Sequence, residues 1–520
     1  MSYQLAQAGP EEQGRLAYKW KVLISVIFGI FMIILDTTVV NVAFQTIRAE
    51  YNTSLGNSQW VISVYVLALG IGTPLSGYLA DRFGIKRMYI GGLAAFVLGS
   101  LLCGLAPLIS SSIWLLVAAR ALQGFSGGVA QPLGAAMLFR TFPPKEQGTA
   151  LGYFGIALMV APALGPILGG LLVDAGLWRW IFFINIPIGA VGVFLASRFL
   201  REYLPEKRPA LDPLGLATAI IGFGAVLYTA SVAADEGWTS APVLIGFGVG
   251  AVALALFALV ELFVAKEPLL NLRLFRIRPF LVASLVGYVS VLALFGAEFL
   301  FPIYLQALRG RTALETGLIL LPLAATAGVV GPIAGRVYDK IGPRALVVAG
   351  FTLLAINTWQ LSQLQATTPI GQLLLLLALR GAALGLTVQT TFATALAAVP
   401  SRLLARGSAL INGSRFLVQS IGVAILATVL ASALSPQVKD LQQQFQVHAS
   451  SQAAQGQHFG LCETPGVPAD QNVPHGVPAA LQPQVQQQLQ IACQEYLGGF
   501  DRTYRLTFFF SLLAIVIGAF

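Results

Sequence analysis

Long apolar runs separated by short polar segments make up most of the chain. A helix needs about 20 apolar residues to cross a ~30 Å hydrocarbon core. Runs near this length lie at residues 22–44, 60–80, 88–107, 112–139, 148–173, 180–199, 213–233, 241–264, 280–307, 315–335, 345–362, 370–398, 408–434 and 504–520. The pattern predicts an all-α integral membrane protein with 14 transmembrane helices. The first run is predicted to be a retained helix and not a removed signal peptide.

A repeat organises these predicted helices. The segment Gly77–Arg87 reads G-Y-L-A-D-R-F-G-I-K-R, and a degenerate copy, G-R-V-Y-D-K-I-G-P-R, lies at residues 335–344. Asp81 and Asp339 are 258 residues apart, an offset that maps the first six helices onto the last six and leaves two between them. The predicted parts are a cytoplasmic N-terminal segment (1–21), a six-helix bundle (22–199), an inserted helical pair (212–264) and a second six-helix bundle (280–520) with a long extracytoplasmic loop (435–503).

Charge content and charge placement agree with a membrane protein. Only 10% of the residues are charged, whereas soluble domains carry roughly 25%. The net charge of +9 resides in short loops and not in a basic domain, so no nucleic-acid partner is expected. If the N-terminus is inside, 21 of the 31 Lys and Arg residues fall in inside segments and seven in outside segments. The positive-inside rule therefore predicts a protein of the inner (plasma) membrane with both termini in the cytoplasm.

The predicted outer loop, residues 435–503, is rich in Gln, Pro and His. Its histidines show no recurring metal-ligand spacing, so no metal site is expected. Cys462 and Cys493 both lie in this loop and are candidates for a disulfide if the outer compartment is oxidising. Whether a periplasmic adaptor protein docks on the loop stays open.

The repeated segment is a candidate gate. An acid at a helix end can accept hydrogen bonds from a neighbouring helix N-terminus and pair with nearby cations. We expect Asp81 to do so and to pair with Arg82 or Arg87, which would hold the cytoplasmic side shut. The candidate gating residues are Gly77, Asp81, Arg82, Gly84, Arg87 and Asp339.

Two acids lie inside apolar runs. Asp36 is about fifteen residues into the first run, which places it ~22 Å from the inner boundary at ~1.5 Å per residue. Glu298 lies about eleven residues before Arg309, ~16 Å below that outer marker. Carboxylates in the membrane are costly and usually face a cavity that carries ions or substrate. Glu298 is a candidate second proton site or a counter-ion for a cationic substrate; the alternatives are a pair with an inward Arg or a place near the outer mouth.

Further motifs carry a resemblance to a known family. They are Leu35–Ala43 (L-D-T-T-V-V-N-V-A), Arg120–Gly124 (R-A-L-Q-G), Gly155 with Gly165–Gly170 (G-P-I-L-G-G), and Trp178–Pro187 (W-R-W-I-F-F-I-N-I-P). Together with the loop segment they resemble the 14-helix drug:proton antiporter family of the major facilitator superfamily, over nearly the whole chain. The resemblance implies a major facilitator fold.

The same resemblance implies roles for individual residues. Asp36 and Arg120 are expected to take part in proton coupling, and Glu298 is added to them on position alone. Asp36, Asn41, Tyr65, Gln123 and Glu298 are the candidate lining of the substrate cavity. The antiporter motif associated with exporters maps onto Gly155, Gly165, Pro166, Gly169 and Gly170.

The sequence lacks a P-loop for ATP, and its loops hold no cluster of catalytic groups, so an ion gradient is the expected energy source and no enzyme activity or cofactor is expected. We predict a proton-coupled antiporter that exports amphipathic or drug-like small molecules by alternating access, with protons, substrate and membrane lipid as partners. The alternatives are a dedicated exporter of one metabolite or lipid, and a non-transporting membrane scaffold.

Overall fold

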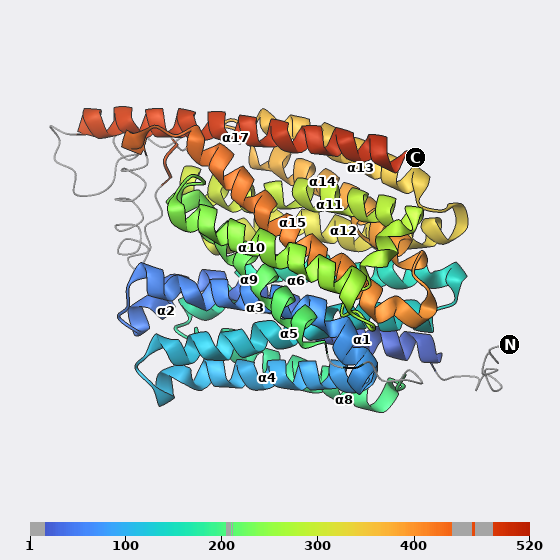
Figure 1. Ribbon diagram of the computed structural model, residues 1–520. Helices are drawn as coiled ribbons and strands as arrows, with labels where there is room; N and C mark the ends of the chain where they lie inside the picture. The colour runs from blue at the N-terminus through green and yellow to red at the C-terminus, as the bar shows by residue number, and fades with distance from the viewer. Residues whose placement is uncertain (1–15, 204–209, 211, 439–459, 463–481, 520) are drawn as a thin grey trace, which may run out of the picture.

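The computed structural model (Figure 1) describes residues 16–203, 210, 212–438, 460–462 and 482–519. Side chains are described for these residues except 55, 234–235, 294–299 and 313. All regular structure in this part of the chain is helical. The predicted all-α membrane class is therefore confirmed.

The N-terminal helices pack as a group below the others in Figure 1. Their bounds are α1 (Tyr18–Val42), α2 (Phe44–Glu50), α3 (Leu55–Phe83), α4 (Ile85–Ile109), α5 (Ile113–Thr141), α6 (Gln147–Asp174), α7 (Trp180–Phe183) and α8 (Asn185–Phe199). The sharp turn between α3 and α4 depends on Gly84, whose φ of +101° is a conformation that favours glycine. This turn places the whole Gly77–Arg87 segment at one end of the molecule, which we call the motif end.

The inserted pair consists of α9 (Pro213–Glu236) and α10 (Ala241–Leu259), and α10 continues as a π-helical turn, η2 (Val260–Val264). Helix α9 contacts both α3 and α15 (Leu404–Ser432), so it lies between an N-terminal and a C-terminal helix. Asp212 caps the start of α9 by accepting a hydrogen bond from the Gly215 amide at 2.9 Å.

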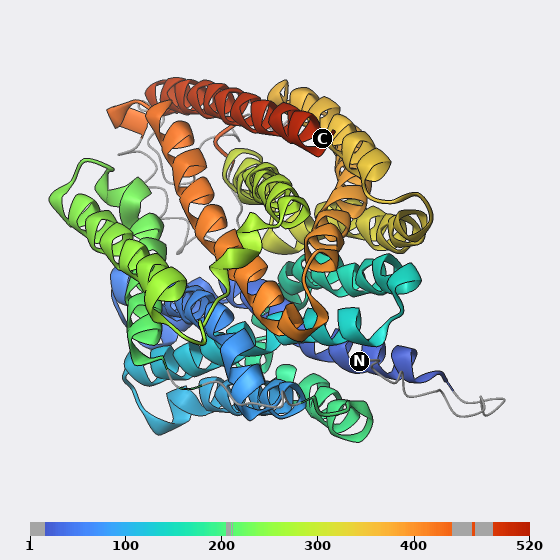
Figure 2. The same ribbon diagram turned by 45° about the vertical axis from the view of Figure 1, so that its right-hand side comes forward.

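The C-terminal helices form the upper group in Figure 1. They are α11 (Arg278–Pro302), the π-helical turn η4 (Ile303–Leu308), α12 (Ala313–Ile341), α13 (Arg344–Ser362), α14 (Ile370–Ala397), α15 and α17 (Gln482–Gly518). A capping box between Thr312 and Glu315 fixes the start of α12. Helix α17 packs along α13 and α11, as the view in Figure 2 also shows.

Twelve helices in the described part of the chain are long and apolar enough to cross a membrane, so the predicted count of 14 is not confirmed. The two helices that would complete it are α11, whose apolar stretch is counted only over Arg278–Ala293, and α17. Helix α17 begins at Gln482, well before the apolar run predicted at 504–520. Gln is a good helix former, so the polar end of the predicted outer loop continues the same helix.

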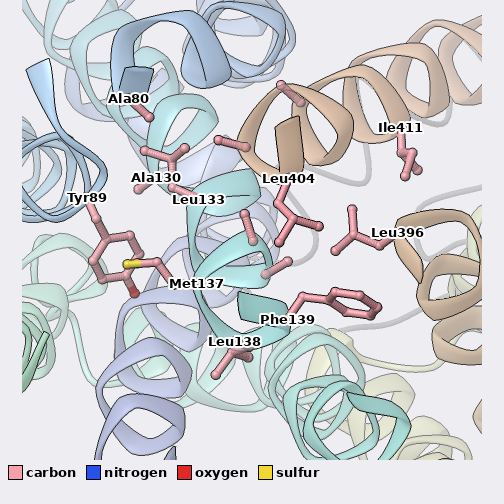
Figure 3. Close-up of a cluster of buried hydrophobic side chains, with 14 of the residues drawn as sticks. Ala80, Tyr89, Ala130, Leu133, Met137, Leu138, Phe139, Leu396, Leu404 and Ile411 are labelled. Carbon is pink, nitrogen blue, oxygen red and sulfur yellow. The ribbon is translucent and has the colours of Figure 1, made fainter. Parts of the chain in front are cut away.

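The two groups of helices share a core at the motif end. In the cluster drawn in Figure 3, Leu133, Met137 and Phe139 of α5 lie in one core with Leu396, Leu404 and Ile411 from the C-terminal group. The buried clusters toward the other end each belong to one group only. One is made of N-terminal residues, among them Val39 and Phe182, and another of C-terminal residues, among them Leu300 and Tyr504. Among the described residues the groups are thus joined by apolar packing at the motif end, which we call the seal.

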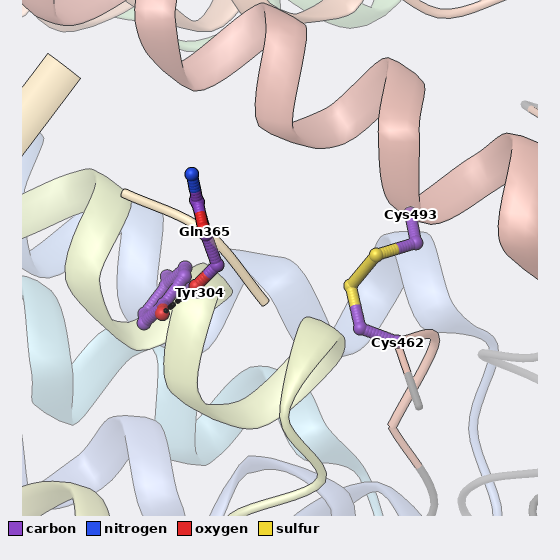
Figure 4. The surroundings of a disulfide bond; sticks show 4 residues. All are labelled: Tyr304, Gln365, Cys462 and Cys493. Atoms are coloured by element: carbon purple, nitrogen blue, oxygen red, sulfur yellow. Dashed lines mark hydrogen bonds between the residues drawn. A yellow bond between two sulfur atoms is a disulfide. The ribbon is translucent and has the colours of Figure 1, made fainter. Parts of the chain in front are cut away.

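A disulfide closes the opposite end of the C-terminal group (Figure 4). Cys462 and Cys493 are bonded, with 5.1 Å between their Cα atoms. The Cys462 amide also donates to the Leu308 carbonyl at 2.9 Å, and Tyr304 Oη donates to the Gln365 carbonyl at 2.7 Å. The predicted outer loop is therefore tied to both η4 and α17. Its histidines, His448, His458 and His475, lie outside the described residues.

Candidate functional site

Asp36 lies at the centre of a polar cluster inside the N-terminal group. Its side chain is 0% exposed, and helices α1, α5 and α8 supply the contacts. One carboxylate oxygen accepts a hydrogen bond from Arg120 Nη1 in an ion pair. The other accepts from Asn185 Nδ2 at 2.8 Å and from Gln123 Nε2 at 3.2 Å. Both oxygens are therefore hydrogen-bonded, and three donors occupy most of the roughly four lone-pair sites of the carboxylate.

Arg120 is fixed from three further sides. Its Nε donates to the Val61 carbonyl at 3.0 Å, and its Nη1 donates to Gln123 Oε1 at 2.9 Å. The guanidinium lies 3.9 Å from the centre of the Tyr65 ring, and Tyr65 Oη donates to the Ile33 carbonyl at 3.0 Å. Cation–π contact and hydrogen bonds offset the cost of burying a charge that cannot be lost.

The cluster holds polar residues that sequence reasoning did not assign. Ser100 on α4 accepts from Gln123 Nε2 at 2.5 Å and from Asn185 Nδ2 at 3.3 Å. Asn185 lies in the quoted Trp178–Pro187 motif but was given no role. A polar side chain in an otherwise apolar run was the available signal, since buried polar groups need partners.

One predicted cavity residue is not part of this cluster, and the side chain of another is not described. Asn41 lies farther along α1, and its side chain is exposed. Glu298 lies on α11, and its side chain is outside the described residues. The C-terminal counterpart of Arg120, Arg380 on α14, is 1% exposed and donates to the Ala293 carbonyl on α11 at 2.6 Å. The repeat thus places a buried arginine against the first helix of each group.

At the motif end, Asp81 on α3 pairs with Arg406 on α15, with 2.5 Å between Asp81 Oδ2 and Arg406 Nε. This differs from the expected pairing with Arg82 or Arg87. Arg87 instead lies beside Glu202, whose carboxylate accepts from the Arg87 amide at 3.1 Å. The reason is packing: a Cβ on Gly77 would lie 2.7 Å from Arg406 Cα, so the missing side chain lets α15 approach α3 closely.

The second copy of the motif makes the mirrored contact. Asp339 on α12 accepts from the Gly148 and Thr149 amides, both at 2.8 Å, and from Thr149 Oγ1 at 2.6 Å. Gly148 and Thr149 form the first turn of α6, so the acid binds a helix N-terminus of the other group. Each motif aspartate therefore joins its own group to the opposite one.

The glycines of the predicted antiporter motif line two faces of α6. Gly165 and Gly169 face α1; a Cβ on Gly169 would lie 2.9 Å from the Val39 carbonyl. Gly155 faces Gln389 of α14, and Gly170 faces Leu314 of α12. Pro166 lies beside Gly317, also on α12. Small residues here let α6 contact its own group and the opposite group at once.

Glu261 of η2 connects the inserted pair to the Asp81–Arg406 pair. It is 1% exposed, and its oxygens accept from the Leu269 and Leu270 amides, each at 3.1 Å. The carbonyl of Pro268, the residue before Leu269, accepts a hydrogen bond from Arg406 Nη1 at 2.8 Å. The Asp81–Arg406 pair, Pro268 and Glu261 form one continuous set of contacts.

Comparison with known proteins shows the family. Residues 26–423 match the Major Facilitator Superfamily. The transporter YhcA of Bacillus subtilis, an uncharacterised member of that superfamily, is 35% identical over 78% of this chain and 76% of its own. The multidrug resistance protein Stp of Mycobacterium tuberculosis is 33% identical over 79% of this chain and 76% of its own.

Solved structures show the same fold at low sequence identity. The human organic anion transporter MFSD10 superposes with a TM-score of 0.60 at 15% identity, covering 95% of this chain and 100% of its own. The proton:xylose symporter XylE superposes with a TM-score of 0.54 at 14% identity, covering 81% of this chain and 96% of its own. On these matches and the helical architecture, the chain belongs to the major facilitator superfamily and is a multi-pass membrane transporter, not an enzyme, with multidrug resistance proteins among its relatives.

Proposed function

We propose that the protein is a proton-coupled antiporter that exports amphipathic, drug-like small molecules across the inner (plasma) membrane. The observation that carries the proposal is the buried Asp36–Arg120 pair, because an acid with one permanent cation deep in a membrane domain is suited to bind and release a proton. Multidrug resistance proteins among the relatives support the substrate class.

Coupling requires that proton binding changes contacts. A proton on Asp36 removes the charge that attracts Arg120 and weakens the carboxyl group as an acceptor for Asn185 and Gln123. Arg120 also contacts the α3 backbone at Val61, so its movement would act on the helix that carries Asp81 in its last turn. Proton binding at Asp36 is in this way connected to the gate.

Alternating access requires two bodies that move against each other. We propose that residues 22–199 and 280–520 are these bodies, with residues 212–264 inserted between them and both termini in the cytoplasm. The motif end is then cytoplasmic, and the seal together with the two aspartate contacts corresponds to a state closed on that side. Opening toward the cytoplasm would break these contacts and separate the seal.

The test is a transport assay in proteoliposomes with an imposed pH gradient and a panel of cationic, neutral and anionic amphipathic dyes. Uphill dye movement that collapses when an ionophore dissipates the gradient is the expected result. Dye flux that ignores the gradient would contradict antiport. Movement of a single compound class would favour the dedicated exporter of one metabolite or lipid, and no movement of any dye would favour a scaffold.

A further inference from the structure

Besides Arg120 and Arg380, a third arginine, Arg415, lies inside a candidate membrane span, and its setting differs from that of Arg120. It is on α15, within the candidate span Ser401–Ser432, and its side chain is partly exposed. Ile411, one turn earlier on the same helix, belongs to the seal, as does Phe392 on α14. Arg415 therefore lies where the shared core ends, on the side away from the motif end.

The contacts of Arg415 are few. Nη2 donates to Thr391 Oγ1 at 3.3 Å, and the guanidinium lies 5.3 Å from the centre of the Phe392 ring. Nε is buried and has no hydrogen-bond partner. Arg120, by comparison, has an acid, an amide oxygen, a carbonyl and an aromatic ring. Much of the donor capacity of Arg415 is thus unused.

No described carboxylate forms an ion pair with Arg415. The titratable side chain that faces it is Tyr288 on α11, whose Oη donates to Ser414 Oγ at 2.7 Å. Glu298 is on the same helix as Gly287, which borders Arg415, but eleven residues farther along, or ~16 Å at helical rise. The Glu298 backbone is therefore well separated from the Arg415 guanidinium.

A permanently charged guanidinium at this depth requires an anion or water to balance it. We propose that Arg415 binds the anionic group of the transported compound, and that the preferred substrates are amphipathic molecules with a carboxylate. The guanidinium can donate two parallel hydrogen bonds to a carboxylate, and Nε is one of the donors it would use. This inference rests on the proposed export function and narrows its substrate class.

The test compares two dyes that differ in one charge, dansylglycine and its neutral amide, dansylglycinamide. Binding to the detergent-solubilised full chain is measured by dye fluorescence, without a pH gradient. We expect the wild type to bind the carboxylate about tenfold more tightly than the amide. Arg415→Gln should remove that preference while the amide affinity stays the same. Arg505→Gln, an exposed arginine on α17, is the matched control and should keep the preference.

A second variant leaves the charge in place. A Cβ on Gly287 would lie 2.9 Å from Arg415 Nη2, so Gly287→Ala should displace the guanidinium and weaken dansylglycine binding selectively. Equal affinity of the wild type for both dyes, no binding of dansylglycine, or equal loss of both dyes in Arg415→Gln would overturn the proposal. Displacement of dansylglycine by millimolar chloride or phosphate would assign the site to an inorganic anion and overturn it as well.

Binding and transport can fail separately. Carboxylate preference without gradient-driven transport would leave this site standing and reject proton antiport. Gradient-driven transport of neutral dyes with no carboxylate preference would retain the proposed function and reject the role of Arg415.

Discussion

Gly148 and Arg406 are 258 residues apart, the offset of the repeat, and each contacts the motif aspartate of the opposite group. Gly148 does so with its backbone amide at the start of α6, and Arg406 with its side chain near the start of α15. The two contacts are equivalent in position and different in chemistry, because Asp339 binds neutral donors and Asp81 binds a cation. Variants at the two sites should therefore differ.

Asp36→Asn should reduce gradient-driven transport to the level of empty liposomes. The amide keeps the size of the side chain and can still accept hydrogen bonds, but it cannot carry a proton. Uphill transport and gradient-free exchange are measured in parallel, and exchange should persist. Gln45→Ala, at an exposed position on the neighbouring helix α2, is the control. Normal uphill transport by Asp36→Asn would remove this residue from proton coupling.

Asp81→Asn should slow transport more than Asp339→Asn. The first change leaves Arg406 without its counter-charge, whereas the second removes acceptor strength from hydrogen bonds to neutral groups. A double-mutant cycle of Asp81→Asn with Arg406→Gln should give a coupling energy on the order of 1 kcal/mol or more. Additive effects on transport would mean that the ion pair does not act as a unit.

Glu261→Gln should impair transport although the residue is far from Asp36 in the chain. The new amide group has one acceptor oxygen for the two N–H groups of Leu269 and Leu270, so the segment that holds Arg406 is released. The effect should be non-additive with Arg406→Gln. Glu236→Gln, an exposed acid at the end of α9, should behave as the wild type. Full activity of Glu261→Gln would show that the contacts of the inserted pair are not needed for the Asp81–Arg406 pair to act in transport.

Gly152→Ala should destabilise the protein by about 1–3 kcal/mol, the usual cost of overpacking. A Cβ at this position would lie 2.5 Å from the Gly331 carbonyl, where α6 meets α12. Gly91→Ala is the matched control, since a Cβ there meets nothing within 4 Å. Thermal unfolding in detergent compares the two. Equal melting temperatures of the two variants would show that α6 and α12 do not pack closely at Gly152.

Glu298→Gln tests the role of the second acid that lies inside an apolar run. If Glu298 is a counter-ion for cations, the variant should lose affinity for a cationic dye and bind a neutral dye of similar size as before. Equal loss for both dyes would favour proton coupling or a structural role, and unchanged affinity for both would place Glu298 outside the transport path.

The sequence allowed the helical class, the repeat and the family to be predicted, because apolar run length and long motifs are local signals. The Asp36, Arg120 and Gln123 group followed from the resemblance, and the structure brings these three residues together. The partner of Asp81 could not be predicted. Arg406 is 325 residues away, in the polar segment between the apolar runs 370–398 and 408–434, and only the packing of α15 onto α3 brings it near Asp81.

Two further features of the structure could not be predicted from the hydropathy pattern. Hydropathy detects the apolar half of α17 and not the polar turns that precede it, although both belong to one helix. Glu261 lies near the end of an apolar run, a position that does not predict burial. Its burial depends on the chain folding back at Leu269 and Leu270, which the pattern does not encode.

Helix α9 also affects whether a compound in the membrane can enter between the two groups of helices from the side. Trp60 of α3 stacks on Tyr228 of α9 with 5.7 Å between ring centroids, and Trp238 donates to Thr428 of α15 at 2.6 Å. On the other flank, α6 and α12 touch from the Asp339 contact to Gly170 and Leu314. Contacts between helices therefore lie on both flanks of the two groups within the described residues. For an apolar compound dissolved in one leaflet, these contacts narrow the space for entry from the side.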